Sequence, residues 1–368
     1  MCKYIFYIVL LMGVSSHVIQ VNATDFVVDD AASLIAAIRS ANLNPDSDSV
    51  TLAADIVLTR ADNGMNGLPL ITSEIIINGN GFGITRSLSP EIPDFRILGV
   101  SSAGHLTLNT ITISNGTVIG QGGGIFNQGT LTIQNSTVNN HHATVTGGAI
   151  YNLNGEVNIR DTIISNNVSS LGAGLASSDG IVTIGDTVFM HNHASEDGGA
   201  IYNFIGMMTL INTTILGNTA DDDAGGLYNR VGTVSVTDSH FIHNAAAEDG
   251  GAILNNTNST LIISASSFTH NLASDDGGAI YNNNNSTVSI DDTTITRNQA
   301  LTNGGGIMNL VGTITIQDSI VSRNTASGFG NDCYLQNTND FASLGNNIFG
   351  DNSSNEGCPH SESDTIRS

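Results

Sequence analysis

The chain has 368 residues, and its 33 acidic residues outnumber 10 basic ones to give a formal net charge of −23. This charge argues against nucleic acid as a partner, because lysine and arginine side chains carry phosphate binding, and against an anionic membrane surface. An apolar fraction of 40% is too high for a disordered acidic chain, so a folded protein with a large core is expected.

Residues 1–23 are typical of a secretory signal peptide. Lys3 supplies the positive start, residues 4–13 form a short apolar stretch, and Val21-Asn22-Ala23 fits a cleavage site. The apolar stretch is too short to span a bilayer, which disfavours a retained anchor. The sequence therefore predicts export, and a mature chain with neither lysine nor an integral membrane segment.

Two cysteines, Cys333 and Cys358, remain after cleavage. In an exported protein, such a pair predicts one disulfide. Closing this loop would stabilise the fold by about 3 kcal/mol in the chain-entropy model. The alternative is two free thiols, and a metal site is disfavoured because no other ligand cluster lies beside the pair in the sequence.

A repeat dominates the middle of the chain. The string GGAIYN occurs at 147–152, 198–203 and 277–282, and variants of it recur every 25–27 residues. Each unit contains three short β-rich segments separated by Gly, Asn and Asp, with no room for a helix. Such strands bury a face only by stacking on the next unit. The repeat therefore predicts an all-β, right-handed, single-stranded parallel β-helix of about eleven coils. Its aligned aliphatic positions are Ile125, Ile150, Leu175, Ile201, Leu227, Ile253, Ile280 and Ile307.

Asparagine also recurs once per coil, in two columns. Stacked about 4.8 Å apart, side-chain amides can form hydrogen-bonded ladders, so we interpret both columns as structural. One column is Asn127, Asn152, Asn203, Asn229, Asn255, Asn282 and Asn309, interrupted by Ser177; the other is Asn167, Asn192, Asn218, Asn244, Asn271, Asn298 and Asn324.

The two ends differ from the repeat. Residues 33–42 have helical periodicity, and Asp29 or Asp30 offers an N-cap, which predicts an amphipathic helix over the open first coil. We expect the β-helix to span residues 24–358. Within it we expect the cap helix and irregular first coils at 24–119, regular repeats at 120–324, a disulfide-closed coil at 325–358, and then a flexible tail at 359–368.

An F-x-x-N pattern also recurs among the units, as at Phe189 to Asn192, Phe241 to Asn244 and Phe268 to Asn271. The GGA[IL] and F-x-x-N motifs together resemble the repeat of the polymorphic outer membrane proteins, within the pectin-lyase-like β-helix superfamily, over residues 120–324. The N-terminal region is similar to secreted bacterial β-helix proteins whose first helix opens Cys-Ser-Leu-Arg-Glu-Ala-Ile, although residues 32–38 lack the Cys, Arg and Glu. The resemblance implies a secreted or surface passenger rather than a defined reaction.

Acidic pairs precede the repeat aliphatic in four adjacent coils. Like charges stacked at the coil spacing repel one another and raise each other's pKa, and Ca²⁺, which prefers carboxylate oxygens, would relieve this repulsion. The alternatives are a solvated acidic edge and catalytic carboxylates. The eight candidate calcium ligands are Glu196, Asp197, Asp222, Asp223, Glu248, Asp249, Asp275 and Asp276.

Two further columns have functional alternatives. One could supply metal ligands, although a surface turn explains it: His191, Gly217, His243, His270, Arg297 and Arg323. The other column could supply the paired carboxyl groups of an inverting hydrolase. However, Asp and Asn are favoured in turns, and the chain has no Trp to form an aromatic platform for sugars. The residues of this column are Asp161, Asp186, Asn212, Asp238, Asp292 and Asp318.

The sequence favours a non-catalytic, adhesin-like protein, secreted or at the cell surface, over an extracellular polysaccharide lyase or glycoside hydrolase of the same fold. A lyase would need a base, and Arg230, Arg297 and Arg323 are available without a constellation that singles one out. Catalytic residues are therefore not assigned, and calcium is the one candidate cofactor. Expected partners are extracellular carbohydrate or a host or matrix surface, and we expect a monomer.

Overall fold

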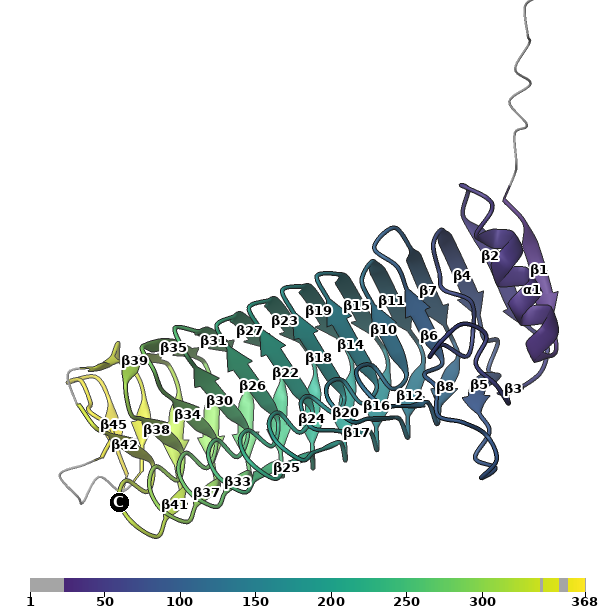
Figure 1. The fold of residues 1–368 in the computed structure, drawn as a ribbon. Helices are drawn as coiled ribbons and strands as arrows, with labels where there is room; N and C mark the ends of the chain where they lie inside the picture. The colour runs from purple at the N-terminus through teal and green to yellow at the C-terminus, as the bar shows by residue number, and fades with distance from the viewer. Residues whose placement is uncertain (1–22, 338–339, 351–356, 368) are drawn as a thin grey trace, which may run out of the picture.

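The computed structural model describes residues 23–337, 340–350 and 357–367. They form a rod of stacked coils, with the first coils at one end and the last coils at the other (Figure 1). The predicted signal peptide, apart from Ala23, lies outside the described residues. Among the described residues, no helix has the length and apolar character needed to cross a bilayer.

Four parallel sheets run along the rod, and each regular coil contributes one strand to each of them. We number the sheets I to IV in the order in which a coil visits them. This arrangement confirms the predicted all-β parallel β-helix. Sheet I has ten strands: β6 (Leu98–Val100), β10 (Ile125–Asn127), β14 (Ile150–Leu153), β18 (Leu175–Ser178), β22 (Ile201–Phe204), β26 (Leu227–Arg230), β30 (Ile253–Asn256), β34 (Ile280–Asn282), β38 (Ile307–Asn309) and β42 (Cys333–Leu335).

Sheet II is the most regular sheet, with alternating buried and exposed residues along its strands. Its thirteen strands are β1 (Asp25–Val28), β2 (Asp48–Leu52), β4 (Glu74–Asn78), β7 (His105–Asn109), β11 (Thr130–Gln134), β15 (Glu156–Arg160), β19 (Ile181–Gly185), β23 (Met207–Ile211), β27 (Thr233–Thr237), β31 (Thr260–Ser264), β35 (Ser286–Asp291), β39 (Gly312–Gln317) and β43 (Phe341–Ser343).

Sheet III follows after a short turn and contains the F-x-x-N aromatic and aliphatic residues. Its thirteen strands are β3 (Ile56–Leu58), β5 (Gly83–Arg86), β8 (Thr112–Ser114), β12 (Thr137–Asn139), β16 (Ile163–Ser165), β20 (Val188–Met190), β24 (Thr214–Leu216), β28 (His240–Ile242), β32 (Ser267–Thr269), β36 (Thr294–Thr296), β40 (Ile320–Ser322), β44 (Ile348–Phe349) and β45 (Thr365–Ile366). The last of these lies within the segment expected to be a tail, and it pairs with β44.

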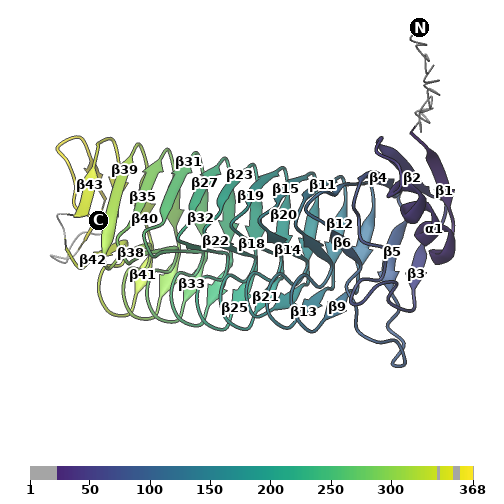
Figure 2. The same ribbon diagram turned by 45° about the horizontal axis from the view of Figure 1, so that its top comes forward.

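Sheet IV adds two-residue strands to the three predicted per coil. Two residues are too few to show an alternation in the sequence, which explains why the pattern did not reveal them. Figure 2 shows these strands along the lower edge of the rod. The nine strands are β9 (Thr117–Val118), β13 (His142–Ala143), β17 (Val168–Ser169), β21 (His193–Ala194), β25 (Thr219–Ala220), β29 (Ala245–Ala246), β33 (Leu272–Ala273), β37 (Gln299–Ala300) and β41 (Thr325–Ala326).

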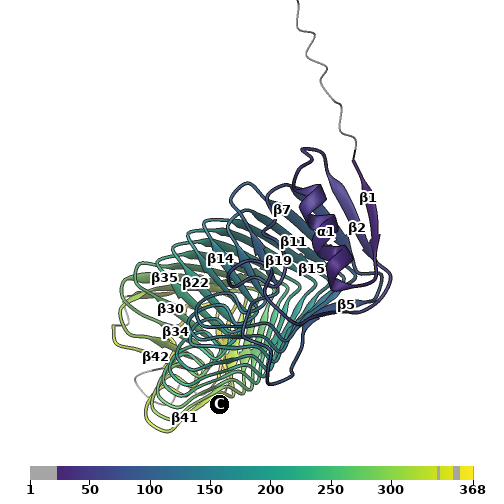
Figure 3. The ribbon, with the colours of Figure 1, turned by 45° about the vertical axis from the view of Figure 1, so that its right-hand side comes forward.

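Inside the coils, a continuous apolar core extends from Val28 to Cys358. Helix α1 (Ala31–Ala41) lies at the N-terminal end of the rod, beside β1 and β2 (Figure 3). Asp30 caps the helix by accepting a hydrogen bond from the Ser33 backbone N–H at 2.7 Å. At the other end, Cys333 and Cys358 form a buried disulfide with their Cα atoms 5.0 Å apart.

Both asparagine columns form buried ladders of amides that donate to one another along the rod axis. In the column after sheet III, the Asn218 amide donates to Asn244 and the Asn244 amide donates to Asn271, each at 3.0 Å. Each Asn oxygen also accepts the backbone N–H of the preceding Asn. This ladder begins at His141 and ends at the carboxylate of Asp332, two terminal residues that the repeat did not predict.

We expect Asn244→Ala to lower the free energy of unfolding by about 3 kcal/mol, because the change leaves two buried donors of Asn218 without an acceptor and the Ile215 carbonyl without its amide donor. Denaturant unfolding of the mature protein would measure this loss. Asn139→Ala is the matched control, since Asn139 lies partly exposed on β12. Equal effects of the two substitutions would contradict the structural role of the ladder.

Candidate functional site

The eight acidic residues predicted as calcium ligands lie on the turns that join sheet IV to sheet I. Backbone hydrogen bonds hold these turns in register, as from Glu248 to Asp222 (2.9 Å) and from Ala224 to Asp249 (2.9 Å). Because identical positions stack, the carboxylates form two parallel columns along the rod. The outer column is Glu196, Asp222, Glu248 and Asp275, and the inner column is Asp197, Asp223, Asp249 and Asp276.

The inner column is a hydrogen-bonded ladder. Asp223 accepts the backbone N–H of Asp249 at 3.0 Å, and Asp249 accepts that of Asp276 at 3.0 Å. Asp276 accepts the backbone N–H of Asn303, and the Asn303 side chain then accepts that of Phe329. In the coil after Asp276, the neutral amide of Asn303 thus accepts the same kind of backbone hydrogen bond. The fold itself does not require negative charge in this column.

Burial and mutual repulsion raise the pKa values of the inner column. The pKa of Asp197 rises to about 7, that of Asp223 to about 6 and that of Asp249 to about 7, in each case mainly because burial disfavours the charged form, with neighbouring carboxylates adding to the effect. In the outer column, the pKa of Glu248 is raised chiefly by the charge of Asp222. Ionising the carboxyl groups of this column near neutral pH therefore costs free energy.

A stripe of tyrosines beside the inner column contributes to this burial. Tyr202, Tyr228 and Tyr281 lie on the opposite face of their strands from the core aliphatics and belong to a second apolar cluster. The Tyr202 and Tyr228 rings stack with centroids 5.2 Å apart. Each of these three tyrosines is only 5–6% exposed, so the stripe is not an open platform for sugars. The Tyr of the GGAIYN string is the sequence signal for this stripe.

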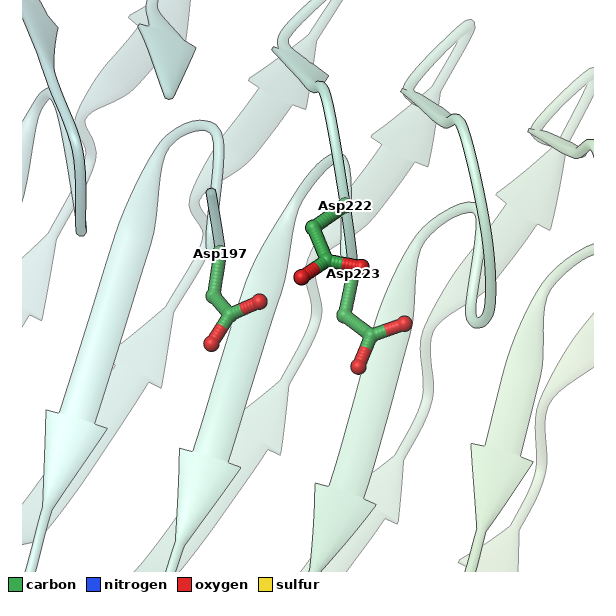
Figure 4. Close-up of side chains that lie close together, drawn as sticks. All are labelled: Asp197, Asp222 and Asp223. Carbon is green, nitrogen blue, oxygen red and sulfur yellow. The ribbon is translucent and has the colours of Figure 1, made fainter. Parts of the chain in front are cut away.

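Three of the carboxylates are close enough to share a cation. Oxygen atoms of Asp197, Asp222 and Asp223 all lie within 4.8 Å of one another. Figure 4 shows Asp222 and Asp223 on one turn and Asp197 on the turn before it. Calcium takes six to eight oxygen ligands, whereas the backbone carbonyls of these three residues already accept hydrogen bonds from neighbouring coils. Water would therefore have to complete the coordination, which is typical of a weak site.

The column considered for hydrolase carboxyls forms the turns between sheets II and III. All six residues have left-handed backbone conformations, which Asp and Asn tolerate well. Asp186 accepts a hydrogen bond from Asn212 at 2.7 Å and pairs with Arg160 at 3.2 Å. This geometry supports turn chemistry as the reason for the column.

The residues considered as a lyase base do not come together. Arg230 is the last residue of β26 in sheet I, where its guanidinium lies 5.7 Å from the Phe204 ring centroid and bonds to Tyr202. Arg297 and Arg323 are exposed on the turns between sheets III and IV. On those turns, the His243 and His270 rings are adjacent, with centroids 4.9 Å apart. All four of these turn residues have left-handed conformations.

Comparison with known families matches the Chlamydia polymorphic membrane protein repeat at residues 186–203 and 265–283. Each matched segment runs from the F-x-x-N motif to GGAIYN and therefore contains one acidic pair. The match indicates similarity of the repeat unit to that of chlamydial surface proteins. No curated protein and no solved structure matches the chain.

We expect Asp249→Asn to stabilise the protein by about 1 kcal/mol at pH 8 and to change little near pH 4. The raised pKa means that the folded state binds the proton more tightly than the unfolded state does. Stability is therefore lost as pH rises from about 4 to about 7, and the amide removes this loss. Unfolding free energies measured across this range would check the prediction.

Asp238→Asn is the matched control, because Asn212 already occupies the same position in the preceding coil. We expect this control not to change the pH dependence of stability. A uniform destabilisation by Asp249→Asn at every pH would mean instead that the carboxylate itself is needed for folding.

Proposed function

We propose that the protein is an exported, non-catalytic β-helix rod that displays its turns to an extracellular partner, as a secreted or surface passenger does. The observation that carries this proposal is the repeat: sheet I pairs in register from β6 to β42, and two of its units match the repeat of chlamydial surface proteins. We further infer that residues 1–23 are removed and that the rod begins at residue 24 and extends past residue 358, since β45 pairs with β44.

The physical properties of the rod support this role. Ladders of buried amides and a continuous aliphatic core fix the turns at regular intervals along the rod axis. A ligand with repeating groups could then contact several turns at once, and such multivalency raises avidity without any new type of contact. The proposed partners are extracellular carbohydrate and a host or matrix surface.

We expect the mature protein to release neither reducing ends nor unsaturated products from a panel of acidic and neutral polysaccharides, and to be retained on immobilised extracellular matrix. Colorimetric and ultraviolet assays would detect the two kinds of product. Product that increases with the amount of intact protein would overturn the non-catalytic proposal, and the ultraviolet signal would separate a lyase from a hydrolase.

Calcium is a proposed ligand of the acidic turns, with Asp197, Asp222 and Asp223 as the group whose spacing suits it best. Bound Ca²⁺ would offset the repulsion between stacked carboxylates. We expect about 1 mM Ca²⁺, the range of weak extracellular sites, to raise the melting temperature and to do so less in Asp222→Asn. Asp238→Asn should respond like the unmodified protein. Equal shifts in both variants would indicate general charge screening instead.

A further inference from the structure

Three unpaired arginines gather at the C-terminal end of this acidic rod. Within the part of the chain that the structure describes, the guanidinium groups of Arg297, Arg323 and Arg367 form no ion pair or hydrogen bond. Most of the other arginines are engaged. Arg39 pairs with Asp62, Arg86 with Asp94, and Arg160 with Asp161 and Asp186; Arg96 donates to Gln121, and Arg230 bonds to Tyr202.

Arg323 and Arg367 line a pocket of about 510 Å³ on the outer face of sheet III. Its size lies within the range typical of small-molecule sites, about 300–1,000 Å³. Hydroxyl groups of Thr294, Thr296 and Ser322 also line it, on β36 and β40. The carboxylate of Asp332 contributes to the lining as well, and it is buried and accepts hydrogen bonds from Asn324. The pocket thus combines cationic, hydroxyl and acceptor groups.

Turn stability alone does not explain arginine at these positions. Arg297 and Arg323 have φ values of 58° and 62°. The same turn position in earlier coils holds Asn140 (57°), Asn166 (56°), His191 (54°), Gly217 (61°), His243 (55°) and His270 (57°). A left-handed conformation costs about 1 kcal/mol or more for most side chains and less for Asn. Side chains that break a local conformational rule are expected at functional or strained sites. The turn itself therefore does not require arginine at positions 297 and 323.

We propose that this pocket binds a sulfated oligosaccharide. A guanidinium group presents a planar fork of N–H donors to an oxyanion, and the tetrahedral sulfate group has enough oxygens to bond to both Arg323 and Arg367. The hydroxyl groups of Thr294, Thr296 and Ser322 can donate hydrogen bonds to the hydroxyl groups of the sugar and accept them in return. Arg297, one coil away from Arg323, extends the positive surface toward a second sulfate group.

The net charge of −23 restricts where such a ligand binds. The acidic turns between sheets IV and I repel a polyanion, whereas the C-terminal arginines attract it. Binding should therefore be local to this end of the rod and weaken with added salt. The site is separate from the proposed calcium group, and its test does not depend on the passenger role.

The test is calorimetric titration of the full chain, without its predicted signal peptide, at low salt. The ligands are a sulfated oligosaccharide, an unsulfated uronate oligosaccharide of the same length, and inorganic sulfate. We expect the sulfated sugar to bind at least about tenfold more tightly than either of the others. Arg323→Asn and Arg367→Gln should each weaken binding about tenfold or more.

Arg60→Gln is the matched control, because Arg60 is an exposed arginine near the other end of the rod. Arg323→Asn restores the side chain used in earlier coils, so its melting temperature should not fall, and a loss of binding cannot come from unfolding. The proposal would be overturned by undetectable binding of the sulfated sugar, by equal binding of the unsulfated uronate, or by an equal loss in Arg60→Gln. Matrix retention and product release are measured in separate assays, so failure of this site is distinguishable from failure of the proposed function.

Discussion

The stacking of each coil on the next in strict parallel register is the constraint on which the rest of this molecule depends. Isolated strands of two to six residues have no stability of their own, and here every strand inside a sheet pairs with the strands of the coils before and after it. Register also decides which side chains meet, because a residue in one coil lies over its equivalent in the next. The rod therefore consists of columns of like residues.

Like residues in a column are stabilising or destabilising according to their chemistry. Aliphatic residues pack, and amides donate and accept along the axis, so Asn244 is satisfied by its own kind on both sides. Stacked carboxylates have the same spacing as the amides of the ladder, but an ionised carboxylate can only accept hydrogen bonds and cannot donate one to its neighbour. In the inner acidic column, backbone N–H groups satisfy one oxygen of each Asp, while burial and repulsion raise the pKa values. The same register that stabilises the core thus brings like charges together in the acidic turns.

The turns have more freedom than the strands, and there the coils differ from one another. The position between sheets III and IV keeps a left-handed backbone throughout, yet it changes from Asn140 and Asn166 to His243 and His270, and then to Arg297 and Arg323. Because the conformation is fixed by the fold, the side chain is free to vary with the surface required. This gradient gives an otherwise acidic rod two chemically distinct ends.

The sequence by itself determined the period, the parallel β-helix and the two asparagine ladders, because these repeat locally and a column can be read from a spacing of 25–27 residues. It also identified which acidic residues would stack. Only the tertiary structure decided what depends on segments far apart in the chain. It buried the Tyr202 stripe beside the acidic column, set Asp249 against a backbone N–H, began one ladder at His141 and ended it at Asp332. It also brought Arg367 to Arg323 through the pairing of β45 with β44. A periodic pattern cannot reveal the two ends of the ladder or the Arg367 contact, because each is made once, by a residue outside the repeat. The Tyr202 stripe and the Asp249 contact do repeat, but a spacing does not show what a side chain faces.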